Sequence, residues 1–194
     1  FIIEDDYDSE FRYKGKPIPA LQGYDRSGKV IYIGTFSKSI APAIRMSYLV
    51  LPERVCSLYK KRCGFISSTV SKVDQLILQK FIEKGYYERH LNKTRALYRS
   101  RHDVLLSTLK EMKTEFTVSG ENAGVHLLLH FCDGRSEKEL IRLAEEKEVK
   151  VYGLSEYYVG ENESVILLGY ANMSDEKILH AARLLDEAWN KEGN

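Results

Sequence analysis

The stretch Phe1-Ile2-Ile3-Glu4-Asp5-Asp6-Tyr7-Asp8 opens the chain, and Val30-Ile31-Tyr32-Ile33-Gly34-Thr35-Phe36-Ser37-Lys38 follows after a loop rich in glycine and proline. Each stretch begins as an apolar run and ends in polar side chains. Continuous apolar runs are typical of strands that are covered on both faces, as in α/β sheets. We therefore expect two buried strands, at residues 1–3 and 30–34, whose carboxyl ends carry an acidic cluster and a lysine.

The composition is that of an ordinary globular protein. The chain has 194 residues, of which 43% are hydrophobic and 29% charged, and its net charge of +1 argues neither for nor against nucleic acid as a partner. No run is apolar enough for a membrane span or a signal peptide. The first residue lies in mid-strand without an initiator methionine, so we expect a fragment whose upstream part is missing. Three cysteines lack metal-ligand spacing and indicate free thiols in a reducing cytoplasm: Cys56, Cys63 and Cys132.

The rest of the first half predicts one more strand and three helices. Only a short segment containing Pro42 separates a strand at residues 46–51 from the preceding one, which favours antiparallel pairing because a helical crossover would not fit. Helices are expected at about 53–62, 72–84 and 86–112, the last bridging two structural units. Basic residues on this bridging helix are interpreted as a solvated face. We place a large domain at residues 1–90 and a small one at 91–194.

The last eighty residues alternate strands and helices, as in a small α+β domain. Ser136-Glu137-Lys138-Glu139 is a capping box that opens a helix to about residue 147, and Ser174 caps the closing helix. The expected strands are residues 116–118, 125–131, 149–152 and 165–170.

Asp5 and Tyr7 are the first candidate site residues. Side chains two apart on an extended segment share a face, so these two point together while Glu4 and Asp6 point away. A carboxylate of this kind can keep a pyridine nitrogen protonated, and a phenol can hydrogen-bond the ring oxygen of pyridoxal phosphate (PLP). On these residues alone, a plain polar loop is the favoured interpretation.

Lys38 supplies the amine that PLP chemistry needs. Thr35 and Ser37 add hydroxyls and Arg45 a guanidinium, a combination that can clamp a phosphate. A lysine crowded by a phosphate site can reach its neutral, nucleophilic form. An exposed lysine and a surface arginine are the alternative, but Asp5 and Tyr7 together with these residues favour the cofactor.

Other candidates are weaker. His126 and His130 lie on one face of a strand without the spacing of a known metal motif, so core or edge histidines are expected and no metal is assigned. The turn Asn122-Ala123-Gly124 is expected to serve backbone geometry, although such a turn could also face a ligand.

The strings Ile3-Glu4-Asp5-Asp6-Tyr7-Asp8-Ser9-Glu10-Phe11-Arg12-Tyr13 and Gly34-Thr35-Phe36-Ser37-Lys38-Ser39 resemble the aminotransferase-like domain of MocR/GabR-type regulators of the GntR family. The resemblance continues through Asn122-Ala123-Gly124-Val125-His126 and Leu168-Gly169-Tyr170-Ala171, and so covers essentially the whole chain. It implies an α/β fold: part of a fold-type-I PLP-dependent transferase (aminotransferase class I/II), with a remnant of the large-domain mixed sheet and an α+β small domain.

The resemblance also implies site roles. Lys38 would carry PLP as an internal aldimine and exchange it for an external aldimine with a small amine or amino-acid-like effector. Asp5 would contact the pyridine nitrogen, Tyr7 the ring oxygen, and Arg45 the phosphate or a ligand. Two hydroxyls, those of Thr35 and Ser37, would line the phosphate.

The same resemblance implies partners and location. A homodimer is expected for the full-length cytoplasmic protein, with DNA bound only by an absent N-terminal domain and with no membrane partner. After Gly169-Tyr170-Ala171, where many aminotransferases have an arginine for the ligand carboxylate, this chain has Asn172, so no named effector is carried over.

Two other functions stay open. A stand-alone PLP-dependent class I/II aminotransferase would use Lys38 in proton transfer as well, although transaminase activity is expected to be weak or absent. Alternatively, a chain of this length is an inactive fragment that holds only half of the site.

Overall fold

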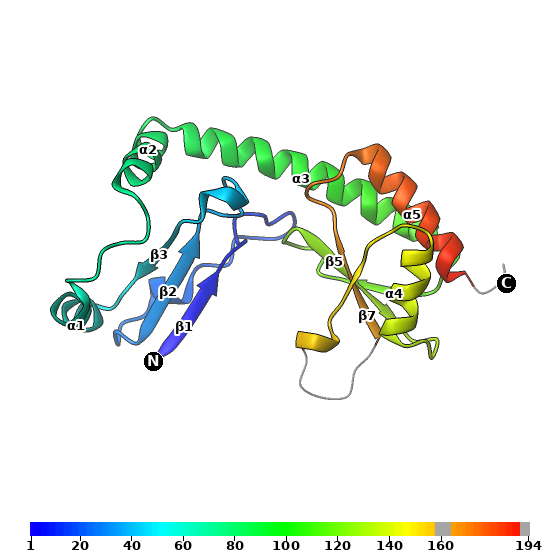
Figure 1. The fold of residues 1–194 in the computed structure, drawn as a ribbon, viewed down its shortest axis with the longest axis horizontal. Coiled ribbons are helices and arrows are strands. Elements are labelled where there is room, and N and C mark those ends of the chain that lie inside the picture. The colour runs from blue at the N-terminus through cyan, green and yellow to red at the C-terminus, as the bar shows by residue number, and fades with distance from the viewer. Residues whose placement is uncertain (158–163, 191–194) are drawn as a thin grey trace. The chain divides into compact units, whose positions relative to one another are not determined.

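A long helix, α3 (Tyr86–Glu111), runs through the boundary between two units of the chain. The computed structural model describes residues 1–157 and 164–190 (Figure 1). Its internal contacts divide the chain into Phe1–Arg95 and Ala96–Asn194. The boundary that we expect between residues 90 and 91 falls on the same helix. None of the helices in the described ranges is both long and apolar enough to cross a membrane.

The first unit is built on a three-stranded sheet in the order β1-β2-β3. Strand β1 (Ile2–Asp6) runs parallel to β2 (Val30–Thr35), and β3 (Ser47–Val50) runs antiparallel to β2, which confirms the expected direction of the third strand. Strand β1 is longer than predicted, because pairing with β2 continues as far as Asp6 opposite Gly34. The acidic residues therefore lie within the strand rather than after it.

The expectation that these strands are covered on both faces is wrong for this chain. In the part of the chain that the structure describes, β1 and β3 carry no buried residue. Ile3 is 67% exposed and Leu49 54%. Only the central strand has buried positions, Val30 and Gly34. The apolar pattern is that of a sheet interior, but the described residues do not supply enough layers to cover it.

Helices and short 3-10 turns complete the first unit. Helices α1 (Glu53–Cys63) and α2 (Lys72–Glu83) form close to the predicted positions, and Ser71 caps α2 by accepting a hydrogen bond from the Asp74 amide. Two 3-10 helices lie in the loops, η1 (Leu21–Tyr24) and η2 (Pro42–Ile44).

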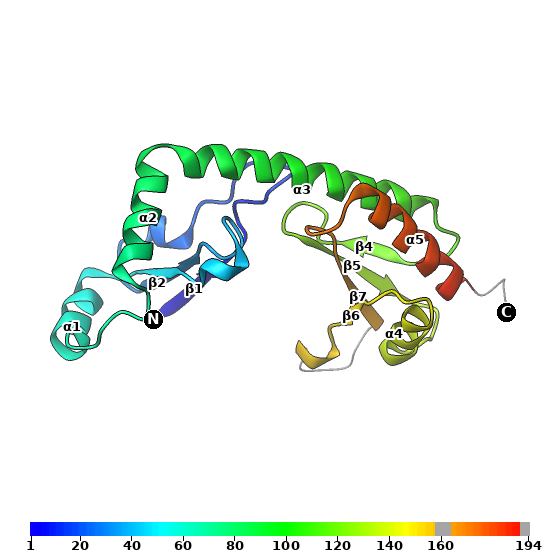
Figure 2. The same cartoon turned by 45° about the horizontal axis from the view of Figure 1, so that its top comes forward.

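The second unit has an antiparallel four-stranded sheet in the order β4-β5-β7-β6 (Figure 2). Its helices α4 and α5 begin as predicted, because Ser136 and Ser174 accept hydrogen bonds from the amides of Glu139 and Lys177. The strand expected at 149–152 shrinks to two residues. The bounds are β4 (Thr117–Ser119), β5 (His126–Phe131), α4 (Glu137–Glu146), β6 (Tyr152–Gly153), η3 (Ser155–Tyr157), β7 (Ser164–Gly169) and α5 (Asp175–Trp189).

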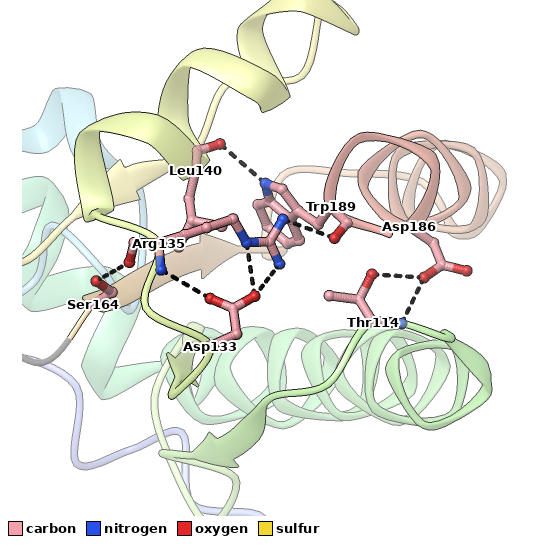
Figure 3. Close-up of polar contacts among 7 residues, drawn as sticks. All are labelled: Thr114, Asp133, Arg135, Leu140, Ser164, Asp186 and Trp189. Atoms are coloured by element: carbon pink, nitrogen blue, oxygen red, sulfur yellow. Dashed lines mark hydrogen bonds and ion pairs between the residues drawn. The ribbon is translucent and has the colours of Figure 1, made fainter. Parts of the chain in front are cut away.

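The core of the second unit lies between this sheet and its helices. Alternate residues of β5 point inward, and the Phe131 ring meets the fully buried Trp189 ring edge-on at 5.1 Å between centroids. The Trp189 indole donates to the Leu140 carbonyl, which joins α5 to α4 (Figure 3). The Arg135 guanidinium binds the Asp133 carboxylate and the Trp189 carbonyl. Both polar contacts and ring packing therefore hold the end of α5 in place.

Candidate active site

Parallel pairing brings the two candidate stretches to one edge of the first sheet. Asp5 pairs with Ile33 and Asp6 with Gly34, so β1 and β2 end at the same level. Tyr7 follows directly on one strand, and the turn that carries Lys38 follows on the other. The structure thus places the carboxylate, the phenol and the amine at the carboxyl edge of a parallel pair, where ligands bind in open α/β sheets.

Alternation along β1 gives its acidic residues different environments. The Glu4 carboxylate accepts from the amides of Leu21 and Gln22 at 2.7 and 2.9 Å, and so caps η1. The Asp6 carboxylate accepts from the Tyr32 hydroxyl at 2.8 Å and from the Ser9 hydroxyl at 2.7 Å. Among the described residues, nothing hydrogen-bonds the Asp5 carboxylate, which is exposed. Asp5 is therefore available to a ligand, whereas its neighbours are engaged in the fold.

The Tyr7 phenol lies half-exposed beside the acidic cluster. The charge of Asp8, then partial burial and the charge of Asp5, raise the pKa of Tyr7. Since an unperturbed phenol already titrates near pH 10, this group stays protonated at neutral pH. Tyr7 can consequently donate a hydrogen bond to an oxygen that faces the site.

The turn that carries Lys38 is closed at its base by backbone and hydroxyl contacts. The Phe36 amide donates to the Met46 carbonyl at 3.0 Å, and the Ile40 amide donates to the Phe36 carbonyl at 2.9 Å. The Thr35 hydroxyl donates to the same Met46 carbonyl and accepts from the Ser37 amide. Lys38 itself is exposed. The Thr35 hydroxyl is thus engaged in closing the turn, and the amine of Lys38 projects from a defined backbone.

Arg45 lies at the other end of this loop in an unusual backbone conformation. Its φ of 48° and ψ of 36° are left-handed, a region that non-glycine residues seldom occupy. Such conformations occur more often at ligand sites, where the surrounding structure maintains them. Arg45 is exposed and Ser37 half-buried, and both have side chains available for an anion.

Residues 96–157 and 164–190 of the second unit contribute no comparable constellation. Asn172 lies exposed in the turn between β7 and α5. His130 Nε2 lies 2.6 Å from the Ser119 hydroxyl, which gives this histidine a structural partner. Across residues 1–157 and 164–190, no group of three His, Cys, Asp or Glu side chains could hold a metal ion.

Sequence reasoning missed the residues that lie behind the turn carrying Lys38. Tyr48 of β3 and Tyr87 of α3 both lie against Phe36, with ring centroids 5.3 and 5.9 Å away. Burial is the main cause that raises the pKa of Tyr87, and the nearby Ser39 hydroxyl opposes the shift. The available signal was Gly34 inside a predicted strand, because a glycine there often marks a place where another group approaches closely.

Known proteins resemble this chain over nearly its whole length. The family described as aminotransferase class I and II matches residues 5–185. An uncharacterized HTH-type transcriptional regulator, YhdI of Bacillus subtilis (strain 168), is 41% identical over 191 residues, which cover 97% of this chain and 41% of that protein. The probable rhizopine catabolism regulatory protein MocR of Rhizobium meliloti is 32% identical over 191 residues, covering 97% of this chain and 39% of MocR.

The fold agrees with this assignment. The crystal structure of Pyrococcus horikoshii kynurenine aminotransferase in complex with PMP superposes with a TM-score of 0.87 at 26% identity, covering 99% of this chain and 48% of that one. The chain spans less than half the length of each of these three proteins. It belongs to the aminotransferase class I and II family, as a partial α/β domain of the PLP-dependent type.

Proposed function

We propose that this chain is the PLP-binding, effector-sensing part of a MocR-type transcription regulator. The similarity to YhdI and MocR supports the regulator assignment, and membership of the aminotransferase family implies PLP as the cofactor. The observation that carries the proposal is the edge shared by β1 and β2, with Asp5 uncommitted on one strand and Lys38 exposed beyond the other.

The donor set at this edge fits PLP. Asp5 would hold the proton on the ring nitrogen, and Tyr7 would donate its phenolic proton to the ring oxygen. The Lys38 amine would be the point of covalent attachment. Arg45 and Ser37 would bind the phosphate, while Thr35 would support them by closing the turn. When bound, PLP supplies an aldehyde that condenses with amines and a pyridinium ring that withdraws electrons.

The proposed effector is a small amine or amino-acid-like molecule that competes with Lys38 for the cofactor. Releasing the lysine would change the contacts that the large domain, placed at residues 1–90, makes around the cofactor; residues 91–194 are placed in the small domain. In a cytoplasmic homodimer, that change would shift the populations of two arrangements of DNA-binding domains. DNA would be bound only by an N-terminal domain of the whole protein.

Trapping the cofactor on the chain tests this proposal. The chain is incubated with PLP and reduced with borohydride, which makes any link to a lysine permanent, and the label is mapped by mass spectrometry. We expect selective labelling of Lys38, its loss in Lys38→Ala, and its retention in Lys29→Ala, which removes another surface lysine near β2. Label scattered over many lysines in the wild-type chain would contradict the proposal.

A stand-alone aminotransferase is the second candidate, because the superposed structure is an aminotransferase. The two functions differ in what the whole protein does with an amine. A regulator whose Lys38 is replaced by alanine should still bind DNA but lose its response to the effector. Robust transamination with a panel of amino donors, and no DNA binding, would favour the enzyme.

A further inference from the structure

The strand pairings place two tyrosines and a glycine on the face of the sheet opposite Asp5. Glu4 pairs with Tyr32, and Gly34 pairs with both Asp6 and Tyr48, so Tyr32, Gly34 and Tyr48 share one face. Asp5 and Ile33, one position away along their strands, face the other side. This second face therefore lies directly behind the proposed cofactor site.

Tyr48 lies across β2 at the one position that has no side chain. A Cβ added to Gly34 would lie 2.4 Å from Cζ of Tyr48 and 2.5 Å from its hydroxyl oxygen, well inside contact distance. The Tyr48 ring lies between those of Tyr32 and Phe36, at ring-centroid distances of 6.1 and 5.3 Å, so moving it away from Gly34 would disturb both ring contacts. Gly34 thus permits the close contact with Tyr48, and any larger residue at this position would displace the Tyr48 ring.

Phe36 connects this contact to the lysine. Its ring meets Tyr48 in a tilted arrangement and Tyr87 edge-on, and its backbone holds the Met46 carbonyl and the Ile40 amide. Ser39, on the far side of Lys38, is fully buried. Phe36 before Lys38 and Ser39 after it are consequently packed, while Lys38 itself is exposed.

We propose that Phe36, Tyr48 and Tyr87 form an aromatic brace that positions the Lys38 turn, with Tyr48 as the residue on which it depends. This inference rests on the proposed function of Lys38 as the attachment point for PLP. Tyr48 is a positioning residue, because it acts through Gly34 and Phe36 and not on the cofactor. Misplacement of a reacting group by about 1 Å can slow a reaction on the order of 100-fold, so a loosened turn should react much more slowly.

Three variants test the brace, and two further variants are controls. Tyr48→Ala removes the ring, and Tyr48→Phe keeps it, while Tyr59→Ala controls for loss of a tyrosine of similar exposure (50% against 40%) on α1 of the same unit. Gly34→Ala displaces the Tyr48 ring while leaving the tyrosine itself unchanged. Gly169→Ala is its control, since a Cβ at that strand glycine would meet nothing within 4 Å.

The first measurement is hydrogen exchange of residues 36–46 in the cofactor-free chain. Tyr48→Ala and Gly34→Ala should exchange about tenfold faster or more in this segment, because the bonded amides of Phe36 and Ile40 lose their packing. Tyr48→Phe and both controls should match the wild type. Unchanged exchange in Tyr48→Ala and Gly34→Ala would overturn the brace, whatever the labelling shows.

The second measurement is the rate of PLP labelling at Lys38 relative to Lys29 in the same molecule. This ratio should fall about tenfold or more in Tyr48→Ala and Gly34→Ala and recover in Tyr48→Phe. A wild type that labels Lys38 selectively, with variants that keep the same ratio, would overturn the positioning role. A wild type without selective labelling would refute the proposed function instead, and the exchange result would still decide the brace.

Discussion

Replacing Asp186 by alanine should destabilise the second unit strongly. One oxygen of this carboxylate, on α5, accepts from the amide and the hydroxyl of Thr114, at 3.0 and 2.9 Å (Figure 3). Thr114 is buried, and it lies in the segment that follows α3. The two hydrogen bonds therefore join the end of α5 to the segment that follows α3. Without them, the amide and the hydroxyl of Thr114 are two buried donors with no acceptor.

The contacts of Asp186 set the expected magnitude. Each buried donor left without a partner costs about 1–3 kcal/mol, which amounts to about 2–6 kcal/mol for two. Alanine favours the helix over aspartate by roughly 0.5 kcal/mol. Removing a negative charge near the carboxyl end of α5 contributes roughly 0.3–1 kcal/mol in the same direction. The lost bonds dominate, and subtracting the two offsets leaves a net destabilisation of about 0.5–5 kcal/mol, out of a typical total of about 5–15 kcal/mol.

Urea denaturation followed by tryptophan fluorescence measures this change. Trp189 is the single tryptophan of the chain and lies fully buried in the same unit, so its signal reports on that unit. Glu187→Ala is the matched control, because Glu187 is the next residue on α5 and makes only an exposed ion pair with Lys147 at 3.3 Å. The lost ion pair costs about 0.2–1 kcal/mol, and removing a negative charge this close to the carboxyl end of α5 offsets a similar amount, so the control should change the free energy of unfolding little.

Asp186→Asn separates the acceptor from the charge. The amide retains an oxygen that can accept from Thr114, so this variant should lose about 1 kcal/mol or less. If Asp186→Ala costs no more than Glu187→Ala, the two bonds to Thr114 do not stabilise the unit and the reasoning is refuted.

Three further perturbations have defined outcomes. Ser174→Ala removes the cap that accepts from the Lys177 amide and should cost about 1 kcal/mol by the same fluorescence assay, against no change if the cap is dispensable. Glu4→Ala should speed hydrogen exchange of the two η1 amides that its carboxylate holds, and unchanged exchange would contradict that role. Hydrogen bonding, first from the Val30 amide, lowers the pKa of Asp25 from 3.8 to about 2. Because the folded pKa is depressed, its stabilisation is present above pH 3.8 and is lost as the pH falls toward 2. An NMR titration of the Asp25 carboxyl checks the pKa, and Asp25→Asn should remove this part of the acid sensitivity.

Local sequence signals determined most of the elements. Ser136 and Ser174 mark the starts of α4 and α5, because a serine side chain can accept from the amide three residues on without help from the rest of the fold. The short link containing Pro42 settled the antiparallel direction of β3, since a helical crossover would not fit. The two strand-end stretches, together with residues 122–126 and 168–171, were also enough to identify the family by resemblance.

Tertiary structure decided which contacts the residues at the strand ends make. Asp5 and Asp6 are adjacent and chemically identical, but only pairing of β1 with β2 brings Asp6 to the Tyr32 hydroxyl and leaves Asp5 open. The contact of Tyr48 with Gly34 likewise requires two strands to be placed in register. The apolar pattern predicted that the strands of the first sheet are buried, but β1 and β3 carry no buried residue. Whether a strand is buried depends on which layers are present to cover it. Hydrogen bonds and packing between distant segments are set by the neighbours that folding supplies, and a local pattern does not contain them.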